Sequence, residues 1–216
     1  MNATRLRCAV LLGALAAPAA AHAQVERLAG RLDAGTRSAV TAVIDSVSGA
    51  GVPAGPLVNK ALEGASKGAD GGRIVAAVRA LAGDLARARL GLGAAATEPE
   101  LVAGAAALRA GETPDFLARL RRDYPRESLV VPLAVVADLV ARGVPADTAV
   151  QSVTALMREG ERDEDLVAFR QSVERDIALG AAPGGAASAL SPGTGTIPGN
   201  NASGLGTQTP ARPRKP

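Results

Sequence analysis

Few side chains of this 216-residue chain could act as nucleophiles, general bases or metal ligands. Its one histidine is His22 and its one cysteine is Cys8, and both precede Gln24, where we expect the mature protein to begin. The mature chain would then contain neither residue type. That excludes Ser-His-Asp triads, cysteine nucleophiles, zinc fingers, disulfides and histidine-ligated haem. Carboxylate chemistry and serine or lysine chemistry stay open.

Carboxylates are the main candidates for catalysis. A hydrolase or lyase could use an acid pair drawn from Asp138, Glu159 and Glu161, although the spacing does not single out these three. The densest acidic cluster, Glu161–Asp165, lacks the alternating ligands, central glycine and distal glutamate of a calcium loop. We interpret it as the acidic first turn of a helix capped by Asp163. The sequence therefore predicts no metal, no cofactor and no assignable catalytic residue.

A basic run is the strongest candidate for a binding site. Its members are Arg119, Arg121, Arg122 and Arg126, and they surround Tyr124. The run could bind an anionic partner such as lipopolysaccharide or a nucleic acid, or it could be the solvated face of a short helix. The chain has only one tyrosine, two phenylalanines and no tryptophan, so it offers no stacking platform for single-stranded nucleic acid.

A glycine-rich turn at Ser66–Gly72 has some features of a phosphate-binding loop. Such a loop follows a strand and places its lysine after the second glycine, whereas here a helical pattern precedes the turn and Lys67 precedes Gly68. We therefore interpret the turn as a helix end.

The N-terminus has the three parts of a secretory signal peptide. Arg5 and Arg7 are followed by the apolar stretch Val10–Ala20 and by an A-x-A motif that ends at Ala23. We expect cleavage between Ala23 and Gln24. The apolar stretch is too short to span a bilayer comfortably, so the mature chain should have no transmembrane segment. Arginine far outnumbers lysine and alanine is abundant, which is typical of a high-GC bacterium, so we expect a periplasmic or secreted protein.

The elements that must position any site are helical. From Gln24 to Gly180 almost every apolar stretch has helical spacing, as in Val40, Val43, Ile44 and Val47. No segment alternates convincingly with period two. We expect an all-α domain over residues 24–180 with a core of alanine, valine and leucine.

An internal repeat organises these helices. Gly51–Ala54 recurs as Gly143–Ala146, 92 residues later, and apolar positions match at this offset on three successive helices. A looser middle copy covers Thr97–Arg122, 43 residues after the first copy and 49 before the last. These spacings resemble those of HEAT and armadillo arrays. The prediction is tandem helix-turn-helix repeats that form a small bundle or a short HEAT-like solenoid. The Gly-Val-Pro loops could mark a binding edge or simply end one helix and aim the next.

The C-terminal segment Ala181–Pro216 is rich in Gly, Pro, Ser and Thr, and we expect it to be a disordered tail. Residues 24–180 hold 19 Lys and Arg against 21 Asp and Glu, a net charge of −2. The basic isoelectric point therefore comes from the signal peptide and the tail, which argues against nucleic acid as a partner.

The segment Gly51–Leu85, with its Glu63-Gly64 and Lys67-Gly68 pairs, resembles parts of uncharacterised secreted bacterial helical-repeat proteins. That resemblance implies no activity. Because the sequence also lacks a reactive constellation, we expect a non-enzymatic helical-repeat protein that is structural or binds a protein partner in the cell envelope. The alternatives are a carrier of a small apolar ligand between its helices and a carboxylate-dependent hydrolase or lyase. The oligomeric state stays open.

Overall fold

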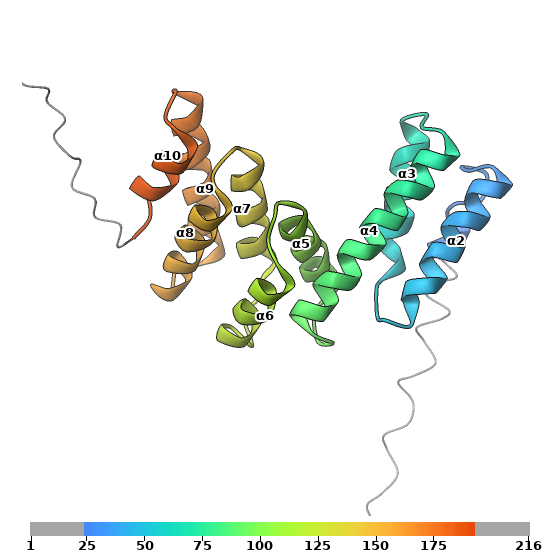
Figure 1. The fold of residues 1–216 in the computed structure, drawn as a ribbon, viewed down its shortest axis with the longest axis horizontal. Helices are drawn as coiled ribbons and strands as arrows, with labels where there is room; N and C mark the ends of the chain where they lie inside the picture. Colours follow the sequence, from blue (N-terminus) through green and yellow to red (C-terminus); the bar gives the residue numbers. More distant parts are fainter. Residues whose placement is uncertain (1–23, 193–216) are drawn as a thin grey trace, which may run out of the picture.

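The computed structural model describes residues 24–192, which fold into helices and turns without a strand (Figure 1). The all-α prediction is therefore confirmed for this part of the chain. After a helical turn at residues 24–26, the helices are α2 (Ala34–Ser48), α3 (Ala54–Ser66), α4 (Gly71–Leu92), α5 (Glu98–Arg109), α6 (Pro114–Asp123), α7 (Val130–Ala141), α8 (Ala146–Arg158), α9 (Asp163–Ala178) and α10 (Pro183–Ala189). The signal peptide that we expect at residues 1–23 lies outside the described residues.

Several helix starts follow from capping residues that the sequence already marks. The Asp70 carboxylate accepts from the backbone N–H of the third helical residue, and Thr97 forms a capping box with Glu100. The expectation that Asp163 caps α9 was wrong. Arg162, not Asp163, is the cap residue, and the carboxylate that accepts its backbone N–H at 3.0 Å belongs to Asp165.

One type of turn ends six helices within residues 24–192, and three of these turns lie inside the predicted helix-turn-helix units. Gly68, Gly111 and Gly160 each end a helix with φ of +66°, +112° and +80°, a conformation that glycine adopts without strain. The residue after each glycine donates its N–H to the carbonyl five residues earlier, at 3.0–3.1 Å. These pairs are Ala69 to Gly64, Glu112 to Ala107 and Glu161 to Leu156. Each turn thus joins two helices of a helix-turn-helix unit.

The 92-residue duplication is equally visible. Helices α3 and α8 begin and end 92 residues apart, and α4 and α9 begin 92 residues apart. The two Gly-Val-Pro loops share their backbone too, with φ of +72° at Gly51 and +89° at Gly143. Val52 and Val144, which follow these glycines, are both buried. These loops therefore end one helix, anchor a valine in the core and aim the next helix.

The helices follow one another along an elongated array (Figure 1). Helix α4 packs against α2, α3, α5 and α6; α5 also packs against α7, which contacts α8 and α9; and α10 lies on α8 and α9. The buried side chains form two clusters, the first from Leu28, before α2, to the start of α7 and the second from the middle of α7 to α10. This succession favours the short solenoid over a single closed bundle.

The predicted domain boundary at Gly180 was wrong, because a further helix, α10, follows it. Ala186 and Ala187 of α10 are buried, and the Ser191 hydroxyl lies 2.5 Å from that of Ser152 on α8. The composition of this segment is that of a loop, but small residues let the short helix pack closely on α8 and α9. The rest of the predicted tail, residues 193–216, lies outside the described residues.

Truncation tests the revised boundary. A chain that ends at residue 180 should be less stable than the full chain by about 1.5 kcal/mol, because it exposes the face of α8 that α10 covers. For a domain of this size, that loss lowers the thermal midpoint by roughly 3–6 °C. A chain that ends at residue 192 is the control and should keep the full-length midpoint, since Ile197 and Leu205 are the only large apolar side chains beyond it. Equal midpoints for the two truncations would show that α10 contributes nothing.

Candidate functional site

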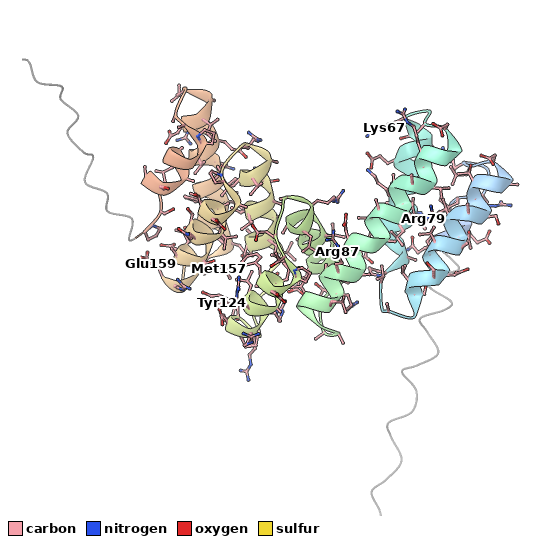
Figure 2. The ribbon with its side chains drawn as sticks, in the orientation of Figure 1. Lys67, Arg79, Arg87, Tyr124, Met157 and Glu159 are labelled. Carbon is pink, nitrogen blue, oxygen red and sulfur yellow. The ribbon has the colours of Figure 1, made fainter. Side chains whose placement is uncertain are left out.

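The surface where α6 meets α8 collects the residue types that mark a binding site. Glu112 before α6 interacts electrostatically with Asp147 at the start of α8, and Tyr124 after α6 interacts with Arg158 at the end of α8, so matching ends of the two helices face each other. Between these ends, Val150 and Met157 of α8 contact both core clusters. We call Glu112, Tyr124, Asp147, Met157 and Arg158 the α6–α8 seam. Figure 2 shows Tyr124 and Met157 in the same region of the array, where α6 and α8 meet.

Tyr124 and Met157 are half-buried, so each presents part of its side chain to solvent. Burial raises the pKa of the Tyr124 hydroxyl above its ordinary value, Arg158 opposes the rise, and Asp123 and Glu127 add to it. The hydroxyl is therefore neutral at physiological pH and can donate a hydrogen bond to a partner.

The predicted arginine site is only partly a surface. Arg119, Arg122 and Arg126 are exposed, and within residues 24–192 none of them forms an ion pair. Arg121 does not belong with them. Its guanidinium donates to the Glu100 carboxylate and to the backbone carbonyls of Tyr124 and Glu127, at 3.3 and 3.1 Å. Arg121 therefore holds the α6–α7 connection, and three exposed arginines border the seam.

Glu100 has structural contacts that the sequence analysis did not predict. The Thr97 capping box indicated a local role, but the carboxylate also accepts from Arg121 of α6 and from the backbone N–H of Leu129 at 3.1 Å. Burial alone would raise the pKa of Glu100. The hydrogen bonds from Thr97, Leu129 and Arg121 outweigh burial and lower the pKa below its ordinary value. One carboxylate thus joins α5, α6 and the start of α7.

Glu112 is a second acid that the sequence did not single out. Its Oε1 atom is buried and has no hydrogen-bond partner within the described chain. Burial raises the pKa of this carboxyl, the negative charge of Asp147 raises it further, and Arg119 opposes the rise. Burying an ionised oxygen without a hydrogen-bond partner is unfavourable, so the Glu112 carboxylate destabilises the fold at this end of the seam.

The acids considered for catalysis lie in an interhelical ion pair and at the end of α8. Asp138 on α7 lies 3.4 Å from Arg170 of α9, and this guanidinium also binds Glu174 at 2.8 Å. Glu161, after the end of α8, shares a hydrogen bond with Asp165 of the first turn of α9, which raises the pKa of Glu161, and the charge of Glu159 raises it further. Glu159 ends α8 on the surface. Each of these acids has a role in helix ends or in interhelical ion pairs.

The turn at Ser66–Gly72 is the helix end that we expected. Lys67 and Lys60 both donate hydrogen bonds to the Glu63 carboxylate. These bonds lower the pKa of Glu63 to about 2, and the bond from Lys67 has the larger effect. The Lys67 ammonium is thus engaged within its own helix.

An open groove of about 510 Å³ lies between α2 and the segment before it. Charged and hydroxyl side chains make up much of its lining, including Glu26, Arg37, Ser38, Thr41 and Asp45. It does not have the apolar lining that a carrier of a small apolar ligand would need.

Neither a metal cluster nor a membrane span is found within residues 24–192. No three acidic, histidine or cysteine side chains of this region are grouped so that they could hold a metal ion. None of its helices combines the length and the apolarity that crossing a bilayer requires. In comparisons with known proteins, no family model, no curated protein and no solved structure matches the chain.

Proposed function

We propose that this chain is an exported, non-enzymatic helical-repeat protein that binds a protein partner in the bacterial cell envelope through its α6–α8 seam. The observation that carries the proposal is the surface itself. Half-buried Tyr124 and Met157 pack on the first core cluster at this surface, and Tyr124 is flanked in the chain by exposed Arg122 and Arg126, which form no ion pair in the described part of the chain.

The residue types at this surface support a protein partner. Tyrosine, methionine and arginine are enriched at the centres of protein interfaces, whereas lysine and glutamate are depleted there. The chain has one tyrosine and, after the initiator, one methionine, and both are at the seam. Tandem helical repeats also expose a face of every unit, which is how extended binding surfaces arise.

Site-specific photo-crosslinking in cells tests this proposal. A photoreactive residue at Arg122 should give a crosslink to one defined envelope protein, and Tyr124→Ala should weaken that crosslink several-fold. The same photoreactive residue at Asp45, exposed on α2, is the matched control and should not give this product. The absence of a product at Arg122, or the same product at Asp45, would contradict a partner at the seam.

Export is tested independently by the mass of the mature N-terminus. We expect a chain that begins at Gln24, because the basic start, apolar stretch and A-x-A motif of residues 1–23 match a signal peptide. Arg7→Glu should slow export, since the positive start orients the signal. A chain that begins at Met1 and stays in the cytoplasm would contradict the proposed location.

A carboxylate-dependent enzyme is the weaker candidate. Glu112 and Asp147 are an acid pair that the sequence did not predict, and the pKa of Glu112 is raised by burial and by Asp147. Such a shift is typical of a general acid. However, Glu112 does not line the groove at α2, and its unpartnered oxygen is covered at the seam.

A further inference from the structure

The groove at α2 has no part in the proposed seam. It lies between α2 and the segment before it, at one end of the array (Figure 1). Arg37, Thr41 and Asp45 line it and follow one another at intervals of four, so they form one row along the helix surface. Helix α2 packs on α3 and α4 through its buried residues. The row therefore belongs to a second face of α2, on which the groove is open.

The 92-residue duplication shows what this face does in the second copy of the repeat. At that offset the row matches Leu129, Leu133 and Ala137, which are all buried. Leu129 and Leu133 belong to the first core cluster, and their helix α7 packs on α5. The matching face is thus a helix–helix contact in one copy and an open groove in the other. The residues that match α5 are 6–17, within the signal peptide that we expect cleavage to remove.

The charges on the row make it complementary to itself. Arg37 and Asp45 are exposed, and within residues 24–192 neither forms an ion pair. Thr41 lies midway between them, and its hydroxyl donates to the carbonyl of Arg37 at 2.9 Å, so burying Thr41 leaves no donor unpaired. Rows of this spacing run parallel when two helices cross at about −50°, the commonest packing class. A two-fold axis at Thr41 then brings Arg37 of each copy opposite Asp45 of the other.

We propose that this chain forms a symmetric dimer, in which the α2 groove of each copy receives α2 of the other copy. Ala34, Ser38 and Ala42 also line the groove, and their short side chains let the two helices approach closely. The two Arg37–Asp45 pairs fix the register and the antiparallel direction, while buried apolar surface supplies most of the affinity.

The dimer should be weak. One helix pair with short side chains buries less than the roughly 1,600 Å² of a standard interface. Glu26 lines the groove from the turn before α2 and is outside the proposed pairing, so it adds no ion pair. The dimer would carry two α6–α8 seams, and it does not depend on the partner proposed there.

Exchange of charges between copies tests the dimer and its symmetry. Analytical ultracentrifugation of the full chain at about 100 μM should give a mass that approaches twice that of the monomer. Arg37→Asp alone, or Asp45→Arg alone, places like charges opposite each other twice and should raise the dissociation constant at least about tenfold. A mixture of these two variants should dimerise again, because every contact then joins opposite charges. The double variant should also dimerise.

Matched controls separate this contact from other causes. Arg122→Asp reverses an exposed arginine at the seam and should leave the dimer unchanged. Both α2 substitutions suit the helix dipole, since the aspartate is added near the start of α2 and the arginine in its last turn. Circular dichroism should therefore show the same helix content in every variant.

Four results would each overturn the proposal. They are a wild-type chain that stays monomeric, single variants that dimerise like the wild type, a mixture that stays monomeric, and loss of the dimer in Arg122→Asp. The first result would leave the groove to residues 6–17 of an uncleaved chain or to a different protein. The last would place the contact between copies at the seam.

Discussion

Replacing Glu100 with alanine should lower the free energy of unfolding by about 3 kcal/mol, the largest effect that we expect from a single substitution in this chain. The Glu100 side chain is only 7% exposed and that of Arg121 is 22% exposed. Without the carboxylate, the Arg121 guanidinium loses its charged partner and the N–H of Leu129 loses its acceptor. Breaking one side of a buried pair costs more than the pair contributes, because a charge is left uncompensated.

Urea unfolding of the full chain measures this loss. Arg121→Ala should also be strongly destabilising, whereas Arg122→Ala, the neighbouring exposed arginine, should change stability by less than about 0.5 kcal/mol. Equal effects for Arg121→Ala and Arg122→Ala would show that Arg121 is a surface residue after all.

The same site also predicts a dependence on pH. Because the pKa of Glu100 is lowered in the folded chain, its contribution is fully present above the ordinary glutamate pKa and is lost as the pH falls through the lowered value. Glu100→Gln should therefore flatten this part of the acid denaturation curve. A Glu100→Gln chain with an unchanged acid limb would contradict the lowered pKa.

Two glycines of α4 should respond to alanine in opposite directions. At Gly91 an added Cβ would lie 2.7 Å from the Leu117 Cβ and 2.7 Å from the Pro114 carbonyl oxygen, so α6 approaches α4 too closely for any side chain. At Gly83 nothing lies within 4 Å of the added Cβ. Gly83→Ala should stabilise the chain by about 1 kcal/mol through helix propensity. Gly91→Ala should destabilise it by about 2 kcal/mol, since overpacking exceeds that gain.

Thermal unfolding of both variants provides the measurement, with each acting as the control for the other. Both substitutions change the same helix by the same atoms, so propensity and the unfolded state contribute nearly equally. The difference between the two therefore isolates the approach of α4 and α6. If both variants were stabilised, α6 would not pack on α4 at Gly91.

The amino-acid sequence by itself determined the local structure, because the interactions that set it lie within about five residues. Asp70 and Thr97 cap helices through N–H groups three residues away, and Gly68 ends a helix through a bond from the next residue to the carbonyl of Gly64. The duplication could be recognised for the same reason, since each copy repeats these local signals. One such signal is the loop before α3, Gly51–Ala54, which recurs as Gly143–Ala146 before α8.

Only the tertiary structure decided which of several similar residues have which role. Arg121 and Arg122 are neighbours of the same type, and what separates them is Glu100, 21 residues away in the chain. Helix α10 has the composition of a loop, and its order depends on packing against α8 and α9. The pKa of Glu112 is raised by burial and by the charge of Asp147, which belongs to another repeat. Periodicity and capping fix a helix and its buried face, but the partners of a side chain depend on how separate repeats pack, which no short-range pattern encodes.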